Sequence, residues 1–374
     1  ESISTNFLHK KVTTIYAKDE KDSQGYITNL RSQDDYPVEE INYFFTGNIP
    51  LYILSLFWTT HIGILLDNEL SDDCYGNRLD INTGEDVFKN NYRAFKIYIN
   101  QYNNWRDKAI QTSLHLLESQ NDALLISLDF KQCFYHLAVD WPEIYKFIQK
   151  NDEENSKFFN FLTTVIQKIH EKYYLETKFF LSKTHQITEK TFSTETIPIG
   201  LPSSRVLANW ELKKFDLNVK ENLRPVYYGR YVDDILLVIN NPNSEIVKFG
   251  TAETLKNYLV KTGILSDKDN NKKVKLKKID GKFENAYKVK GYFDLYIQNS
   301  KIIVHYYDHR HSWAGIKEFM EELKHRSSEF RFLPEEDQYK DLVDEAYDIR
   351  YDGSVYRFRS VIGINENATK LSQF

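Results

Sequence analysis

The chain has 374 residues with 49 Lys and Arg against 54 Asp and Glu, and its formal net charge of −5 excludes a protein that coats nucleic acid through general positive charge. A hydrophobic content of 41%, with only 14 Gly and 8 Pro, excludes a disordered chain and predicts a large core with few flexible linkers. The two cysteines, Cys74 and Cys133, exclude a disulfide framework and a cysteine zinc site, favour a reducing compartment and predict a cytoplasmic protein.

Residues 1–115 are predicted to be mainly helical, because apolar and aromatic positions recur at three and four residues in stretches such as residues 95–119. One apolar stretch, "IPLYILSLFWTTHIGILL" at residues 49–66, reaches the length of a membrane-spanning helix. Thr59, Thr60 and His61 interrupt its centre, so we predict a core helix and no membrane partner. A membrane-bound effector would depend on this stretch alone.

The rest of the chain alternates irregularly between strands and helices, which is typical of an α+β core with helical additions. The apolar run "ALLISLDF" at residues 123–130 predicts a buried strand, and a strand, a turn and a strand are expected at residues 229–238. Helices are predicted at residues 143–175, from about Ser204 onward, and at residues 244–261 and 313–374. Further strands are predicted at residues 273–280 and 287–297.

Two adjacent aspartates, Asp233 and Asp234, stand between short apolar runs in "GRYVDDILLV". A solvated turn would explain them, because Asp is a common turn residue. Adjacent carboxylates also repel each other, and a divalent cation relieves that repulsion. Asp129 ends the predicted strand at residues 123–130, where a charge is costly unless it binds something. If the two strand units lie side by side in one sheet, the three carboxylates could hold two Mg²⁺ ions about 3.5–4 Å apart.

Four short motifs carry a resemblance to a known family. The stretches "SLDFKQCFYHL", "IPIGLPSSRVLAN", "YVDD" and "VKGY" resemble motifs A, B, C and E of reverse transcriptases in their order and rough spacing. The resemblance implies an RNA-directed DNA polymerase with an α+β, right-hand fold of fingers and palm and an α-helical C-terminal region. It places a mainly helical N-terminal and fingers region at 1–122, a palm with finger insertions at 123–312, and a helical thumb-like or C-terminal region at 313–374.

The same resemblance assigns roles to individual residues. Asp129, Asp233 and Asp234 would be catalytic, and together with Phe130 they would hold two Mg²⁺ ions, with Mn²⁺ able to substitute. Phe134 matches the aromatic wall that excludes a 2′-hydroxyl and selects deoxynucleotides, although ordinary core packing would also explain it. The remaining residues that match the nucleotide site are Gly200, Ser203, Ser204, Arg205 and Asn209. The residues that resemble the primer grip are Lys290, Gly291 and Tyr292.

The triphosphate of an incoming nucleotide needs positive charge from the fingers, because phosphoryl transfer depends on positioning and charge neutralisation. The candidates for this charge are Arg93, Lys96, Arg106 and Lys108, and a solvated helix charge is the alternative for each. The lysine-rich stretch at residues 266–278 is either a local contact for nucleic acid or a solvated loop. The cluster of His305, Asp308, His309 and His311 matches no zinc template in its spacing, so we predict structural or RNA contacts there.

Two positions depart from the family pattern. Ile199 stands where many reverse transcriptases have Gln, and Arg205 stands where Pro usually follows the motif's Ser. With the aromatic-rich front region, these departures resemble the prokaryotic defence-associated reverse transcriptases of the unknown and abortive-infection groups, above all the second polymerase subunit of the type 3 systems. This resemblance implies antiphage activity with dNTPs as substrates and a noncoding RNA, a DNA product or both as bound nucleic acid. It also implies a second reverse transcriptase subunit or a homo-oligomer as partner, and synthesis that is protein-primed or lacks an ordinary template.

A scaffold with a polymerase fold is the alternative function. Such a protein would bind RNA or a partner polymerase without turnover. The three intact aspartates favour the polymerase, because a scaffold has no use for mutually repelling carboxylates.

Overall fold

The computed structural model describes residues 4–12, 38–80, 94–184, 196–243, 250–266, 274–277 and 283–310. The chain divides into two compact units, Glu1–Lys10 with Glu39–Phe319, and Lys11–Val38 with Met320–Phe374. Nearly all described residues belong to the first unit. The helical end predicted at residues 313–374 lies outside the described part of the chain.

The first unit begins with a strand pair and a long helix. Strands β1 (Ser4–Val12) and β2 (Val38–Thr46) form a two-stranded sheet. The sequence did not predict these strands, because a strand is stabilised by a partner that can lie far away in the chain. Helix α1 (Ile49–Trp58) then continues through the π-helical turn η1 (Thr59–Gly63) into α2 (Ile64–Asp67).

The stretch Ile49–Asp67 is, among the described residues, the one helix that is long and apolar enough to cross a membrane, judged by length and composition only. In this structure its inner face contacts two other helices. Trp58 is fully buried and donates a 3.0 Å hydrogen bond to Thr163 of α6 (Ser156–Thr184). Ser55 donates at 2.8 Å to the hydroxyl of Ser203 in α7 (Pro202–Asn218). One side of this helix therefore packs against α6 and α7.

The rest of the described chain mixes helices and strands, so the α+β fold class is confirmed. The other helices and helical turns are α3 (Tyr98–Glu118), α4 (Cys133–His136), α5 (Trp141–Asn151), η2 (Val219–Leu223), α9 (Thr251–Leu255), η3 (Lys256–Val260) and η4 (Asn299–Lys301). The other strands are β3 (Ala123–Asp129), β4 (Tyr227–Tyr231), β5 (Asp234–Asn240), β6 (Val274–Lys277), β7 (Phe283–Lys288), β8 (Tyr296–Gln298) and β9 (Ile303–Tyr307).

Local chemistry explains where two of these helices begin. The carboxylate of Asp140 caps α5 by accepting a 3.1 Å hydrogen bond from the backbone N–H of Glu143. Pro142 and Pro202 stand in the first turns of α5 and α7, where a missing N–H costs nothing. The predicted strand at residues 123–130, the predicted helix near Ser204 and the predicted hairpin are therefore confirmed as β3, α7 and β4–β5.

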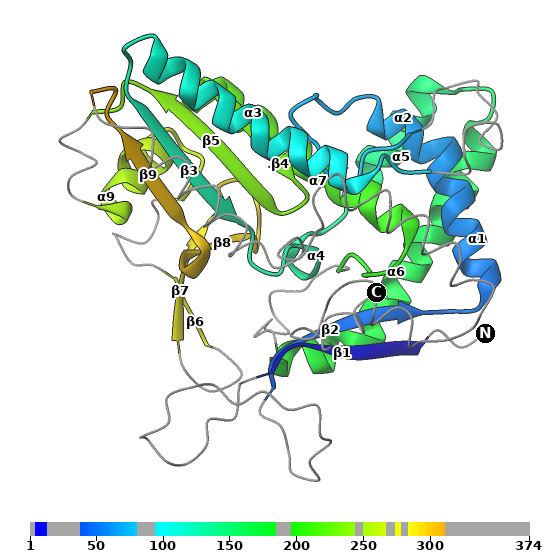
Figure 1. Cartoon of the computed structure of the whole chain (residues 1–374). Coiled ribbons are helices and arrows are strands. Elements are labelled where there is room, and N and C mark those ends of the chain that lie inside the picture. Colours follow the sequence, from blue (N-terminus) through cyan, green and yellow to red (C-terminus); the bar gives the residue numbers. More distant parts are fainter. Residues whose placement is uncertain are drawn as a thin grey trace, which may run out of the picture. The chain divides into compact units, whose positions relative to one another are not determined.

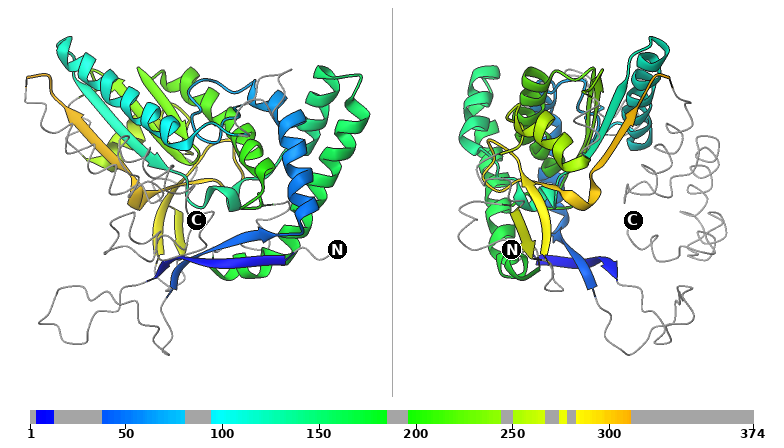
Figure 2. Two further views of the ribbon diagram at one scale, coloured as in Figure 1. Left: turned by 45° about the vertical axis from the view of Figure 1, so that its right-hand side comes forward. Right: turned by 90° about the vertical axis from the view of Figure 1, so that its left-hand side faces the viewer.

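A four-stranded antiparallel sheet, here called the central sheet, has the strand order β4-β5-β3-β9 (Figure 1). Strand β3 pairs with β5 up to Asp129↔Asp234, and with β9 from Ala123↔Tyr307 to Ser127↔Ile303. Every residue of β3 is buried. Helix α3 runs along one face of this sheet, and Figure 2 shows the same arrangement in two further views. A separate three-stranded sheet has the order β6-β7-β8.

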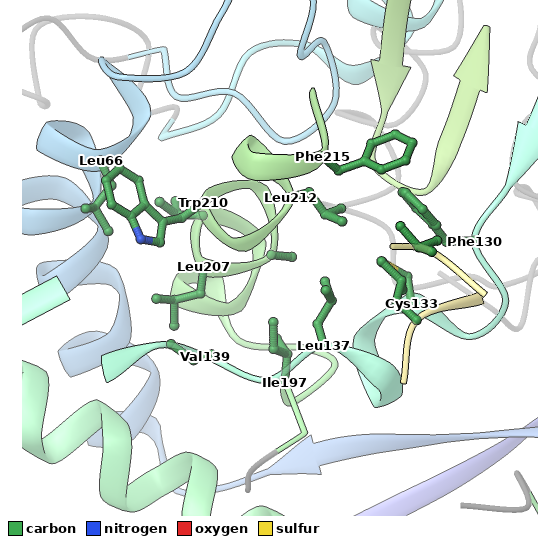
Figure 3. Close-up of a cluster of buried hydrophobic side chains, with 14 of the residues drawn as sticks. Leu66, Phe130, Cys133, Leu137, Val139, Ile197, Leu207, Trp210, Leu212 and Phe215 are labelled. Atoms are coloured by element: carbon green, nitrogen blue, oxygen red, sulfur yellow. The ribbon is translucent and has the colours of Figure 1, made fainter. Parts of the chain in front are cut away.

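Helix α7 packs its side chains into the main hydrophobic core (Figure 3). Trp210 lies on the side of α2, near Leu66, while Phe215 points to the end of β3 and meets Phe130 with ring centroids 5.0 Å apart. Burying apolar surface stabilises a fold by about 25 cal/mol per Å². Because α7 packs against α2 at one end and against the end of β3 at the other, it fixes the position of the residues that follow β3.

Candidate functional site

The three predicted carboxylates meet at one end of the central sheet. Asp129 ends β3 and is only 5% exposed, and it is the direct cross-strand partner of Asp234 at the start of β5. Asp233 precedes Asp234 in the turn, and its carbonyl accepts a 3.1 Å hydrogen bond from the N–H of Phe130. The sequence predicted that these residues meet if the two strand units lie side by side, and the register confirms that they do.

The turn that carries Asp233 has an unusual backbone. Val232 adopts φ = 56°, a left-handed conformation that is a genuine outlier for a β-branched residue. Such a conformation costs on the order of 1–3 kcal/mol and persists only where surrounding contacts hold it. The turn therefore needs support from outside the hairpin.

Arg230 supplies part of that support from the interior. Its side chain is fully buried and donates to both carboxylate oxygens of Asp216 in α7, at 2.8 and 2.9 Å. It also donates to the side chain of Asn209 at 3.0 Å and to the carbonyl of Val232 at 2.9 Å. Although burial opposes the charge, Asp216 beside it raises the pKa of Arg230. One buried cation thus joins α7 to the strained turn.

The loop before α3 supports the same turn from the other side. Tyr75 donates its backbone N–H to the backbone carbonyl of Arg230 at 2.8 Å, and Asn209 donates its side-chain amide to the carbonyl of Gly76 at 2.8 Å. A Cβ atom at Gly76 would lie 2.6 Å from the backbone nitrogen of Val232, closer than real Cβ atoms approach. Gly76 therefore permits a backbone contact that a larger residue would prevent.

Lys301 lies against the carboxylates, which the sequence did not predict. Its ammonium is 2.8 Å from Oδ2 of Asp129, and the two side chains are 29% and 7% exposed. Burial opposes the charge of Lys301, but the carboxylates of Asp129, Asp233 and Asp234 outweigh it and raise the pKa of the amine. A cation of the chain itself therefore neutralises part of the negative charge at this site.

The predicted motif B residues lie just before α7 and in its first half, and their side chains have different surroundings. Gly200 has φ = 107°, a conformation that L side chains rarely adopt. Ser203 and Asn209 are buried and have interior partners, Ser55 and Gly76 respectively. Ser204 is 1% exposed, and its hydroxyl has no hydrogen-bond partner among the described residues.

The predicted cationic residues do not share one contact, and Arg93 lies outside the described residues. The guanidinium of Arg205 lies 5.1 Å from the ring centre of Phe95, and Lys96 is exposed. Arg106 instead pairs with its neighbour Asp107 at 2.8 Å. The structure thus places Arg205 over an aromatic ring and keeps Arg106 in a local pair on α3.

The aromatic pair that follows Asp129 divides into a buried and a half-buried ring. Phe130 is 1% exposed and belongs to the main hydrophobic core. Phe134 is half-buried in α4, and its carbonyl accepts a 2.9 Å hydrogen bond from Ile197. Its ring packs against the main core, as the alternative prediction required, and keeps an exposed part.

The predicted primer-grip residues border a cavity of about 480 Å³. The hydroxyl of Tyr292 donates to the carbonyl of Glu211 at 2.8 Å and accepts from the N–H of Phe215 at 3.1 Å, so this loop is fixed to α7. Gly291 turns the loop with φ = 88°, and Lys290 is exposed. Burial raises the pKa of Glu211 in the cavity wall to about 7.

A second group of metal-ligating types occurs at the opposite end of β3. Asp122, Asp308 and His309 offer ligand atoms within 4.8 Å of one another, whereas His311 lies outside the described residues. Although burial opposes ionisation, hydrogen bonds from Tyr306 and His309 lower the pKa of Asp122 to about 2. Since a strand rises roughly 3.3 Å per residue, this group lies roughly 20 Å from Asp129. Asp122 was missing from the predicted cluster, because only strand pairing brings it to β9.

Comparison with known families assigns the region that contains the carboxylates. Residues 96–279 match the reverse transcriptase (RNA-dependent DNA polymerase) family. A comparison with curated proteins finds no match. The matched range begins just before α3 and includes β3, α7 and the β4–β5 hairpin, so it holds Asp129, Asp233 and Asp234. Residues 96–279 are thus a reverse transcriptase domain, which classes the chain with the RNA-directed DNA polymerases.

Proposed function

We propose that the chain adds deoxynucleotides by two-metal catalysis, with Asp129, Asp233 and Asp234 as the catalytic carboxylates. The observation that carries this proposal is the cross-strand pairing of Asp129 with Asp234, which gathers three carboxylates at one sheet end. In the proposed right-hand fold, the central sheet is the palm and the elements before it belong to the fingers.

The donor set fits divalent ions such as Mg²⁺ or Mn²⁺. Carboxylate oxygens are the ligands that these hard cations prefer, and the ammonium of Lys301 already stands in for a cation at Asp129. The backbone of Phe130 is adjacent to this set. When bound, two such ions activate the attacking hydroxyl and stabilise the leaving pyrophosphate.

The protein's own residues would position the substrates. The support of the turn by Arg230 and Gly76 keeps Asp233 and Asp234 beside Asp129. Gly200, Ser203, Ser204 and Asn209 would shape the nucleotide site, with Ser203 and Asn209 acting through their interior contacts. Lys96, Arg106 and Arg205 would provide charge for the triphosphate, while Lys290, Gly291 and Tyr292 would hold the primer strand.

Replacing Gly76 with Ala is expected to lower nucleotide incorporation by about tenfold to a hundredfold, because a displacement of about 1 Å at a reacting group can cost that much. The added Cβ would push on the backbone of Val232 and shift the turn. Gly63→Ala is the matched control, since its Cβ would come no closer than 3.5 Å to its neighbours. Incorporation of labelled dNTP measures both variants, and equal rates for Gly76→Ala and the wild type would contradict the proposed support.

Replacing Phe134 with Val is expected to admit ribonucleotides, because the proposed aromatic wall would no longer exclude the 2′-hydroxyl. The ratio of dNTP to rNTP incorporation should fall before the total dNTP rate does. Parallel single-nucleotide assays with matched dNTP and rNTP measure the ratio. An unchanged ratio in Phe134→Val would leave Phe134 with a packing role only.

We further propose a role in antiphage defence, in the cytoplasm, with a second reverse transcriptase subunit or a second copy as partner and a noncoding RNA as bound nucleic acid. The motif resemblance described above supports this placement. Ile199 and Arg205 support synthesis that is protein-primed or lacks an ordinary template, because the Gln and Pro that usually stand at these positions are missing. A protein pocket can select a base, since an unpaired buried polar group costs about 1–3 kcal/mol.

The direct experiment is to incubate the purified chain with each dNTP and Mg²⁺, with and without its co-purifying RNA, and to sequence the product. We expect incorporation, and a product of low complexity that does not follow supplied heterologous templates. Faithful copying of each template would contradict untemplated synthesis and leave an ordinary reverse transcriptase. If no dNTP is incorporated under any of these conditions, the proposed polymerase function is wrong.

A scaffold without turnover is the second candidate, and one observation favours it. The ammonium of Lys301 pairs with Asp129, so the chain itself supplies a counter-charge to the carboxylates. Such a scaffold would bind RNA or a partner polymerase and give no product in the assay above.

A further inference from the structure

Lys301 lies in the turn that leads into the last strand of the central sheet. Lys301 ends the turn η4, two residues before Ile303, and Ile303 pairs with Ser127. The turn η4 interrupts this pairing, and the next bridge along β3 joins Phe130 to Ile297, so Lys301 reaches Asp129 from a turn beside the strand. On the other side of β3, Asp129 is paired with Asp234. Asp129 therefore has a second carboxylate residue as its strand partner and the ammonium of Lys301 in contact with its side chain.

The contact at this position is an ion pair inside a group of like charges. The ammonium of Lys301 is 2.8 Å from Oδ2 of Asp129, and the charges of Asp233 and Asp234 act on the same ammonium. Three carboxylates this close repel one another unless a cation lies among them. A Lys side chain is a compact point charge on a flexible stem, and at 29% exposure Lys301 has a path to solvent.

We propose that Lys301 is a built-in counter-cation, which holds the carboxylate set together in the metal-free chain and must be displaced before a divalent ion binds Asp129. This inference rests on the proposed metal site. An ammonium and a metal ion cannot share Oδ2 of Asp129, and their positive charges repel. Lys301 therefore raises the divalent concentration at which the site fills.

Metal binding without substrate tests this directly. Mn²⁺ is titrated into the full chain with no nucleotide, and the unbound ion is measured by electron paramagnetic resonance. Each protein is compared with the same protein carrying Asp233→Asn. The difference removes the Mn²⁺ that binds at other sites, such as the group of Asp122, Asp308 and His309. Lys301→Met is expected to bind Mn²⁺ about tenfold more tightly than the wild type, the order expected for removing one screened charge near a dication.

Two control variants separate the charge from the side chain's bulk. Lys301→Arg keeps the positive charge and should keep the weaker wild-type affinity. Lys220→Met removes a lysine that is paired with Asp73 elsewhere, and should leave the Mn²⁺ affinity unchanged. If Lys301→Arg binds Mn²⁺ as tightly as Lys301→Met, the displacement is not electrostatic and the proposal is wrong.

Stability provides a readout that does not depend on activity. In EDTA, Lys301→Met should melt at a lower temperature than the wild type, because the buried Asp129 loses its counter-charge, and the gap should close as Mn²⁺ is added. If the wild type binds Mn²⁺ through Asp233 but Lys301→Met has the same affinity, the counter-cation proposal fails while the metal site stands. If Asp233→Asn changes Mn²⁺ binding in neither background, both the metal site and the counter-cation role fail.

Discussion

Replacing Asp233 with Asn is expected to lower deoxynucleotide incorporation by at least about a thousandfold, which corresponds to about 4 kcal/mol of lost transition-state stabilisation. The change keeps the size of the side chain and removes the charge that would bind the metal ion. The backbone bond from Phe130 to the carbonyl of Asp233 does not involve the side chain, so the turn should persist. Incorporation of labelled dNTP in Mg²⁺ and circular dichroism measure the two effects.

Asp308→Asn is a suitable control for this variant, because Asp308 is a partly buried carboxylate beyond the opposite end of the same sheet. It should retain nearly full incorporation. Asp129→Asn should also be inactive, but it leaves the ammonium of Lys301 without its carboxylate and should be less stable. Near wild-type incorporation by Asp233→Asn would refute the proposed catalytic assignment.

Replacing Asp216 with Asn is expected to lower the free energy of unfolding by about 3–5 kcal/mol, the usual cost of removing one partner of a buried ion pair. Arg230 is fully buried, and Asp216 is its one carboxylate partner among the described residues. The loss leaves a buried guanidinium uncompensated. Urea unfolding followed by circular dichroism measures it.

Glu69→Gln is the matched control, because Glu69 pairs with Lys213 of the same helix α7 at an exposed position. An exposed pair contributes less than about 1 kcal/mol, so this variant should unfold at nearly the wild-type urea concentration. Equal stabilities for Asp216→Asn and Glu69→Gln would show that the buried pair is not a main support. Because Arg230 also holds the carbonyl of Val232, Asp216→Asn should lower incorporation as well.

Local patterns in the sequence predicted the elements that carry the carboxylates. The apolar run before Asp129, the Pro and Gly before α7 and the paired Asp at a turn each have a short-range signal. The meeting of Asp129 with Asp234 followed from the condition that both strand units lie in one sheet, and the strand order satisfies it. The parts that were predicted are those in which neighbouring residues determine the structure.

The supporting residues were missed because their roles depend on distant contacts. Gly76 and Val232 are far apart in the chain, and the pairing of Lys301 with Asp129 depends on β9 joining the sheet. One signal was available for β9, since "KIIVHYY" is rich in β-branched and aromatic residues that favour strands. For Arg230 and Asp216, a charged residue inside an otherwise apolar strand was the available sign of a buried partner.

The central place of β3 has a consequence for synthesis of the chain on the ribosome. Both neighbours of β3 are made after it, β5 from Asp234 onward and β9 only at Ile303–Tyr307. At roughly 5–20 residues per second, the nascent chain has β3 for on the order of 10–35 s before β9 emerges. During that interval the edge of β3 that will pair with β9 is unpaired and can pair with other chains. The yield of folded protein in cells should therefore depend on chaperones that protect the growing chain.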